Sequence, residues 1–245
     1  MATTISTFPP SFADALAAGA AALSEVGTVR WWFSGRVDGD LSEEAAPALS
    51  KAGERLGVPV YTVHQTHGAA VQVLGEDDLV PGGVEVSAVA ADGLVTALDA
   101  TALAVRTADC APVLLWSPEG VIGAAHGGWG GLERGVVGAV ADAMRAEGAT
   151  SIEARLGPCI GPECYEFGQA DLDRLAERFG SEVRAEDSGG RPALDLRAAV
   201  AAAAGEAGVA LAGPVPSCTA CGGGHYSYRA RGDRARQASM IWRER

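Results

Sequence analysis

Two apolar runs separated by a short turn constrain this fold more than any other feature of the sequence. The first run, residues 107–116, contains Cys110, and the second ends at His126. The residues between the runs, 117–120, have proline in second place and glycine in fourth, which suits a tight turn. The pattern predicts a β-hairpin. With the turn centred on its middle pair, His126 would lie opposite Ala111, so a thiol and an imidazole would meet at one end of a sheet.

The rest of the chain alternates apolar runs with amphipathic stretches. Strands are predicted at residues 28–34, 59–64, 71–74, 93–96, 102–106, 152–156, 225–229 and 238–242. Helices are predicted at residues 11–23, 40–55, 132–145, 170–179 and 196–207. Asp40 and Glu43 are spaced as a capping box, residues 77–86 read as an acidic loop, and 102–106 should continue into the hairpin's sheet. Hairpins mixed with scattered helices predict an α+β fold, as a single domain over residues 1–245.

The composition excludes several classes of protein. A net charge of −12 disfavours a nucleic-acid-binding surface. Five cysteines, an odd number in a chain of 245 residues, disfavour a secreted disulfide framework. Residues 1–18 lack the early positive charge of a signal peptide, and no uncharged apolar run is long enough to span a bilayer. We therefore expect a cytoplasmic, soluble protein without nucleic acid, membrane or an obligate protein partner.

Three residues could form a metal site: His67 in a glycine-flanked turn, and Cys110 and His126 at the end of the hairpin. Neutral imidazole and thiolate both bind zinc or copper. Three protein ligands leave a tetrahedral zinc with one open position, as in catalytic sites. The separations of 43 and 16 residues match no short zinc-finger spacing. From the residues alone, a buried apolar Cys110 beside a hydrogen-bonded core His126 is an equally good interpretation.

A second cysteine motif offers a rival metal site. Cys218 and Cys221 form a Cys-x-x-Cys pair, which can be redox-active or half of a zinc site. The other half would have to be Cys159 and Cys164, which have an unusual gap between them. No helix is predicted to begin at Cys218 and lower the pKa of its thiol. The sequence therefore favours two cysteines in a loop ahead of a strand.

Arginines gather near the end of the chain, where guanidinium groups could bind phosphate because they match its geometry. They are Arg229, Arg231, Arg234, Arg236, Arg243 and Arg245. The alternative is a solvated surface that offsets the acidic charge of the rest of the protein.

Several motifs occur in one order between Pro59 and Trp242. They are residues 64–68 (HQTHG), 91–93 (ADG), 107–115 (TADCAPVLL), 123–129 (GAAHGGW), 157–168 (GPCIGPECYEFG), 218–219 (CT) and 226–229 (YSYR). In this order they resemble the laccase-domain, or polyphenol oxidase, family of purine nucleoside phosphorylases, also called peptidoglycan-editing factors. The resemblance implies a four-layer α/β/β/α sandwich with mixed sheets, of the cysteine-hydrolase-like type.

The resemblance also implies an activity and a metal. It assigns His67 rather than His64 as a ligand, together with Cys110 and His126, and it implies zinc, with copper as the alternative. The family activity is phosphorolysis of adenosine, inosine, guanosine and methylthioadenosine, with adenosine deamination beside it. Copper-dependent oxidation of polyphenols and the removal of misincorporated residues from cell-wall precursors are further family roles. The expected partners are therefore small molecules, a purine nucleoside and phosphate.

Further catalytic and binding residues are expected around the ligands. Asp92 and Asp109 are the nearest acids that could protonate a leaving base, and Asp109 is better explained as structural because it adjoins Cys110. Gln65, within the histidine motif, is expected to bind substrate. We therefore assign Asp92, beside the three ligands, to catalysis.

The sequence departs from the family pattern at a point that bears on phosphate. Gly130 stands where the family usually has an arginine, His225 replaces an aromatic apolar residue, and Ala235 replaces a glycine. An arginine near the metal could hold an anion. We expect Arg229 or Arg236, in the terminal motif, to take over phosphate binding.

Other classes of function stay open from the sequence. A metal-free hydrolase would use Cys110 as nucleophile and His126 as base to cut an amide in a cell-wall precursor. A binding protein would keep the fold without turnover, which the loss of arginine at Gly130 makes conceivable. A copper oxidase is the least favoured, because the chain lacks the extra histidines of a multi-copper cluster.

Overall fold

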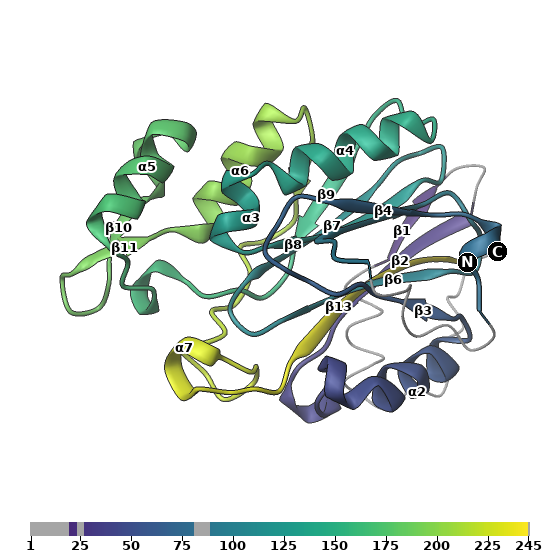
Figure 1. Ribbon diagram of the computed structural model, residues 1–245, viewed down its shortest axis with the longest axis horizontal. Helices are drawn as coiled ribbons and strands as arrows, with labels where there is room; N and C mark the ends of the chain where they lie inside the picture. The colour runs from purple at the N-terminus through teal and green to yellow at the C-terminus, as the bar shows by residue number, and fades with distance from the viewer. Residues whose placement is uncertain (1–19, 24–26, 81–88, 245) are drawn as a thin grey trace.

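The computed structural model describes residues 20–23, 27–80 and 89–244, and within them two large mixed β-sheets face each other (Figure 1). The five-stranded sheet has the order β1 (Ala20–Leu23), β2 (Gly27–Phe33), β13 (Gln237–Glu244), β6 (Ala102–Thr107) and β3 (Val60–Tyr61). The six-stranded sheet has the order β12 (Ala210–Ala212), β9 (Glu153–Leu156), β7 (Ala111–Trp116), β8 (Ile122–Gly127), β5 (Gly93–Thr96) and β4 (Val71–Leu74). A separate ribbon pairs β10 (Arg184–Glu186) with β11 (Pro192–Leu194).

The predicted hairpin forms the centre of the six-stranded sheet. β7 and β8 pair in antiparallel fashion with Pro112 opposite His126, one residue away from the predicted pairing with Ala111. The cause is the turn, in which the Ser117 N–H donates to the Val121 carbonyl at 3.0 Å, so that Val121 joins the loop rather than the strand. The shift still leaves the thiol and the imidazole at the same end of the sheet.

The chain changes sheet immediately before the hairpin. β6 belongs to the five-stranded sheet and β7 to the six-stranded one, so the expectation that residues 102–106 continue the hairpin's sheet is wrong. In the connection, Asp109 adopts φ +96°, which side chains usually avoid. Its carboxylate accepts hydrogen bonds from the Thr219 hydroxyl at 2.6 Å and the Arg229 N–H at 2.7 Å. These bonds hold the strained residue, and they place Cys110 at the crossing between the sheets.

Three buried apolar clusters hold the sheets and helices together. One lies between the six-stranded sheet and the helices above it, α3 (Trp129–Glu133), α4 (Val136–Ala146) and α6 (Leu196–Glu206), and it extends to α5 (Gln169–Phe179), which packs against α6 (Figure 1). Another lies between the five-stranded sheet and α2 (Ala46–Leu56). The third fills the space between the sheets, where Trp31 of β2 stacks on Trp116 of β7 with ring centroids 5.2 Å apart. This stack joins one sheet to the other across that interface.

Helix boundaries differ from the predictions where proline and glycine lie inside the predicted ranges. α2 begins at Ala46 rather than residue 40, because Pro47 fits only the first turn of a helix. The predicted helix 132–145 is broken at Gly135, which has φ +87° and separates α3 from α4. Asp40 is not a helix cap, since its carboxylate accepts hydrogen bonds from Ser42 and from the N–H of Arg236.

Two predictions near the ends of the chain, the helix 11–23 and the strand 225–229, disagree with the structure where it describes them. Residues 20–23 of the predicted helix 11–23 form β1, because pairing with β2 overrides the helix propensity of alanine, and residues 11–19 lie outside the described range. The predicted strand 225–229 is wrong: the last helix, α7 (Tyr228–Arg231), begins there, capped by the Ser227 hydroxyl, which accepts from the Ala230 N–H.

Two other segments, the predicted strand 59–64 and the predicted acidic loop 77–86, also differ from the predictions where the structure describes them. The strand expected at 59–64 is reduced to β3, and the acidic loop expected at 77–86 begins with a 3₁₀ turn, Glu76–Asp78, while its residues 81–86 lie outside the described range. In the part of the chain that the structure describes, no helix has the length and apolarity needed to cross a membrane.

The stacked tryptophans predict which side chain the packing of the two sheets depends on. Trp116→Ala should lower the free energy of unfolding by about 3–5 kcal/mol, because truncating a buried aromatic leaves a cavity between the sheets. Urea unfolding followed by circular dichroism would measure it. Val37→Ala is the control, since the Val37 side chain is 80% exposed and should cost little. Equal losses in the two variants would contradict the role of the stack.

Candidate metal centre

The turn after β3 is wrapped around the buried carboxylate of Asp92. Backbone N–H groups of Thr66, His67 and Gly68 donate to this carboxylate at 3.1, 2.9 and 2.7 Å. His67 adopts φ +60°, a left-handed conformation that is uncommon outside glycine. The hydrogen bonds to Asp92 hold this conformation, so the backbone of the turn fixes the position of the His67 ring.

The three predicted ligands meet in space. The Sγ of Cys110 lies 3.7 Å from Nε2 of His67, and the rings of His67 and His126 are 4.7 Å apart between centroids. One ligand atom from each residue lies within 4.8 Å of the other two. Donors around a tetrahedral zinc stand about 3.3–3.8 Å apart. The residues therefore fit a metal ion with little adjustment, and we call them the trio.

Gly128 lets the chain pass close behind the trio. A Cβ at this position would lie 2.6 Å from Cδ2 of His67 and 3.3 Å from the Sγ of Cys110. Any side chain there would push the histidine out of place. The glycine-rich exit from the hairpin is therefore explained by the space that the trio requires.

Asp92 orients His126 as well as the turn. Its carboxylate lies 2.7 Å from Nδ1 of His126, which leaves Nε2 of that ring for the trio. Burial alone would raise the pKa of Asp92, but hydrogen bonds from His126 and the backbone outweigh it and lower the pKa to about 2. Both oxygens of the Asp92 carboxylate are thus engaged in holding the turn and His126, and the catalytic role predicted for Asp92 stays a prediction.

Charges within the trio favour a thiolate. Burial opposes ionisation of Cys110, yet His126 and His67 together lower the pKa of its thiol to about 6. Burial likewise opposes a charge on His126, but Cys110 and Asp92 raise the pKa of its imidazole. A deprotonated cysteine is the form that binds metal or attacks a carbon.

Other residues singled out in the sequence lie around the trio without joining it. The Gln65 side chain bonds the backbone of Arg106 in both directions, each at 2.8 Å, so it ties the turn to β6. His64 is exposed and lies 3.2 Å from the Glu43 carboxylate. His225 stands outside the trio, where burial lowers the pKa of its imidazole. Gln65 is therefore engaged structurally, and its predicted contact with substrate stays a prediction.

Arg134, which sequence reasoning missed, occupies the space beside Gly130. Its Nη1 donates to the carbonyls of His67 at 3.0 Å and Gly130 at 2.9 Å. A Cβ at Gly130 would lie only 2.7 Å from that nitrogen. Because α3 begins at Trp129, before the predicted helix 132–145, Gly130 and Arg134 lie one helical turn apart. Only the four-residue spacing could have indicated this neighbour.

Arg229 and Arg236, which were expected to take over phosphate binding from the arginine that is missing at position 130, lie in different surroundings. The N–H of Arg229 donates to Asp109, and its guanidinium donates to the Glu166 carbonyl at 2.6 Å and covers the Tyr165 ring at 4.8 Å. Arg229 therefore lies at the edge of the site. The Arg236 guanidinium instead donates to the carbonyls of residues 233–235. The guanidinium is thus engaged with its own loop, and its predicted contact with phosphate stays a prediction.

A row of half-buried aromatic rings flanks the trio. Tyr165 and Phe167 contact each other edge to face at 5.4 Å, and Phe167 contacts Trp129 at 5.7 Å. Burial raises the pKa of the Tyr165 hydroxyl, and the negative charge of Cys110 raises it further, so the two groups are electrostatic neighbours. These rings offer apolar faces on which a flat base could stack.

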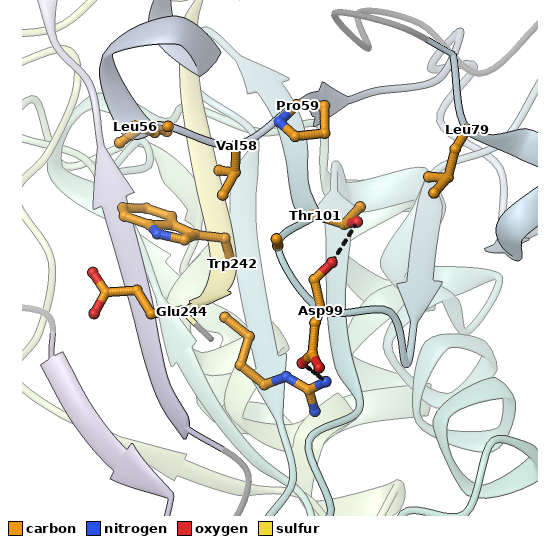
Figure 2. Close-up of a pocket in the computed structure, with 11 residues that line it drawn as sticks. Leu56, Val58, Pro59, Leu79, Asp99, Thr101, Trp242 and Glu244 are labelled. Atoms are coloured by element: carbon orange, nitrogen blue, oxygen red, sulfur yellow. Dashed lines mark hydrogen bonds and ion pairs between the residues drawn. The ribbon is translucent and has the colours of Figure 1, made fainter.

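A large hollow, of about 630 Å³, lies away from these residues (Figure 2). It is bordered by the end of α2, by Asp99 and Thr101, and by the last residues of β13. The hollow adjoins the Ala102 end of β6, whereas the trio follows its Thr107 end. Size therefore does not identify the functional site in this protein.

Comparison with known proteins agrees with the arrangement of the motifs. Residues 34–244 match the family described as multi-copper polyphenol oxidoreductase laccase. A purine nucleoside phosphorylase of Streptomyces griseus is 40% identical over 200 residues, which cover 78% of each chain. An adenosine deaminase from an unknown prokaryotic organism is 34% identical over 167 residues, which cover 64% of each chain.

Solved structures agree with the fold. A Neisseria meningitidis protein superposes with a TM-score of 0.72 at 27% identity, over 89% of this chain and 95% of its own. The family match spans most of the chain, and the Streptomyces relative is matched over more than two thirds of its length. This protein therefore belongs to the laccase-like family whose curated relatives include purine nucleoside phosphorylases.

Proposed function

We propose that the protein is a zinc-dependent purine nucleoside phosphorylase that also deaminates adenosine. The observation that carries the proposal is the trio itself: His67, Cys110 and His126 converge, and Asp92 fixes both histidines. One thiolate and two imidazoles suit zinc, with copper as the alternative. The names of the relatives support a purine nucleoside as substrate, with adenosine, inosine, guanosine and methylthioadenosine as the compounds to compare.

The roles of the protein's own residues follow from their positions. The aromatic row of Trp129, Phe167 and Tyr165 would hold the base, and Arg229 would neutralise phosphate at the edge of the trio. A zinc ion bound by the trio would supply Lewis acidity. Asp92 keeps Nε2 of His126 turned toward the site throughout.

Phosphorolysis exchanges one bond at the sugar. A phosphate oxygen forms a bond to C1′ of the ribose while the bond from C1′ to the base nitrogen breaks, and the proton that hydrogen phosphate loses ends on the departing base. In this proposal Asp92 stays ionised and holds His126, so the proton does not come from Asp92. The Tyr165 hydroxyl keeps its proton at neutral pH, because burial raises its pKa, so it can donate a hydrogen bond to the departing base.

One feature favours a second candidate function. Cys110, His126 and Asp92 have the order of a nucleophile, a base and an orienting carboxylate, with the thiol pKa lowered. A metal-free hydrolase that cuts an amide of a cell-wall precursor would use this arrangement. The zinc content that is lost in His67→Ala, which measures metal at the trio alone, separates the two functions.

We also propose a four-layer sandwich fold and a cytoplasmic location for this protein. The three apolar clusters support a four-layer α/β/β/α sandwich of the cysteine-hydrolase-like type. All five cysteines are free thiols, which suits the reducing cytoplasm.

The activity is tested with inosine and adenosine, each with and without phosphate. We expect ribose 1-phosphate only when phosphate is present, and inosine formation from adenosine in either case. His67→Ala should abolish both activities and lower the zinc content by one ion per chain, whereas His64→Ala should keep both activities and that ion. Of these two histidines, only His67 lies within reach of Cys110. Absence of ribose 1-phosphate from every purine nucleoside would reject the phosphorylase, and equal losses in the two variants would reject the ligand assignment.

The role of Asp92 predicts a loss of metal affinity without loss of the ligands. Asp92→Asn should weaken zinc binding by about 10–100-fold, because an amide accepts hydrogen bonds from His126 and the backbone more weakly than a carboxylate. Competition with a chromogenic chelator would measure it. Asp77→Asn, at an exposed carboxylate, is the matched control and should bind zinc as the wild type does. Unchanged affinity in Asp92→Asn would contradict the positioning role.

The phosphate site is expected at Arg229. Arg229→Ala should raise the KM for phosphate about tenfold or more and spare adenosine deamination, because a charge-assisted contact is lost. Arg236→Ala should leave phosphate use unchanged, since its guanidinium serves its own loop. Phosphate titrations of both variants provide the measurement. An effect confined to Arg236→Ala would mean that the loop rearranges when substrate binds.

A further inference from the structure

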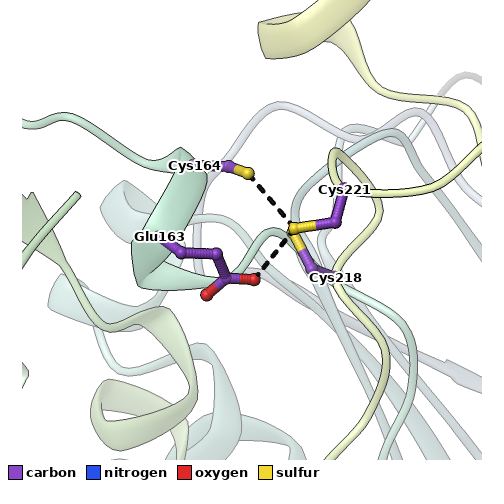
Figure 3. Close-up of side chains that lie close together, drawn as sticks. All are labelled: Glu163, Cys164, Cys218 and Cys221. Carbon is purple, nitrogen blue, oxygen red and sulfur yellow. Dashed lines mark hydrogen bonds between the residues drawn. The ribbon is translucent and has the colours of Figure 1, made fainter. Parts of the chain in front are cut away.

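A second group of metal-binding side chains lies outside the trio. Cys164 ends a 3₁₀ turn, Pro162–Cys164, and its neighbour Glu163 faces the loop that carries Cys218 and Cys221 (Figure 3). One ligand atom from each of these four residues lies within 4.8 Å of the others. We call them the cysteine cluster. The sequence favoured a plain loop here, and the structure instead gathers its thiols.

The pairing differs from the rival site considered in the sequence. That site required Cys159 with Cys164, but Cys159 is fully buried and forms a backbone bridge with Cys218 instead. The Glu163 carboxylate is the fourth member of the cluster, in the place that Cys159 would have filled. Its Oε1 lies 3.2 Å from the Sγ of Cys221, which in turn lies 3.3 Å from the Sγ of Cys164.

The backbone around the cluster is built to hold it. The N–H of Gly161 donates to the Sγ of Cys218 at 3.2 Å, which fixes the position of this sulfur within the cluster. Gly161 also leaves room for the carboxylate, because a Cβ there would lie 2.3 Å from Oε1 of Glu163. Only a residue without a side chain allows Glu163 to fold back over its own turn onto the thiols.

The loop that carries two of the thiols is fastened from outside. The Arg231 guanidinium donates to four backbone carbonyls of this loop, those of Thr219, Ala220, Gly222 and His225. Cys218 and Cys221 are thereby held by contacts that do not involve the cluster itself. A preformed set of donors binds a metal without first ordering the chain.

We propose that Cys164, Cys218, Cys221 and Glu163 form a structural zinc site that is separate from the trio. Three thiolates and a carboxylate complete a tetrahedral zinc shell and leave no open position, which distinguishes a structural site from a catalytic one. Cys221 is exposed, so the ion can enter from solvent.

The site has a consequence for the trio because the two share a connection. Thr219, next to Cys218, donates to the Asp109 carboxylate, and Asp109 precedes Cys110. Arg229 donates to the other oxygen of the same carboxylate. A metal in the cysteine cluster would therefore fasten the loop that positions Arg229, so its loss should weaken phosphate binding more than it slows turnover.

The test measures zinc per chain by elemental analysis, in protein purified with a reductant and without oxygen. In a Cys110→Ser background, which disables the trio, we expect one zinc ion per chain. Adding Cys221→Ser should remove it. Cobalt substitution gives a second readout, since thiolate-to-cobalt absorption should persist in the Cys110→Ser protein and disappear in the double variant. These results do not depend on whether the trio is a phosphorylase site.

Two milder variants keep the test decisive if a cysteine variant fails to fold. Glu163→Gln and Gly161→Ala retain all the thiols, and the Gly161 backbone, at φ −86° and ψ 160°, is open to alanine. Each should lower zinc affinity about tenfold or more by removing or displacing the carboxylate. Equal zinc contents with and without Cys221 would overturn the proposal. So would a mass lower by two hydrogens with no zinc, which would show a Cys164–Cys221 disulfide.

Discussion

The buried carboxylate of Asp92 is the interaction on which the site depends. It lies immediately before β5 of the six-stranded sheet, and it gathers N–H groups from the turn after β3 together with the ring of His126. An ionised group in the interior is costly unless it is hydrogen-bonded on all sides. The need to satisfy this one charge therefore draws separate chain segments to one point and leaves two imidazoles facing Cys110.

The parts of the fold that were predictable have local causes. The hairpin of β7 and β8 and the helices α5 and α6 follow from apolar periodicity bounded by turn residues. The errors have long-range causes. Residues 20–23 pair with β2, although their alanines favour a helix, and β6 leaves the sheet of its neighbour β7 through the strained backbone of Asp109. Neither partner is visible in a window of neighbouring residues.

The same division applies to the site. The trio could be proposed from ordered motifs, which mark residues whose chemistry is distinctive. Arg134 could not, because its place beside Gly130 depends on where the helix begins, and Glu163 could not, because its fold back over Gly161 depends on a missing side chain. The surroundings of Asp92 and Arg236 could not be foreseen either, because residue type does not reveal which hydrogen bonds a group has already made.

Because the chain passes from one sheet to the other at Asp109, the trio lies where the two sheets can be linked. His67 is tied through Gln65 to β6 of one sheet, while His126 belongs to β8 of the other, and Cys110 stands where the chain passes between them. An ion held by all three would join segments 43 residues apart in sequence, much as a disulfide closes a loop. At about 1,000 times its dissociation constant such a ligand adds about 4 kcal/mol to the folded state. The thermal stability of the protein would then depend on how much metal the cell supplies. A chain made without the metal would be degraded more readily than one that holds it.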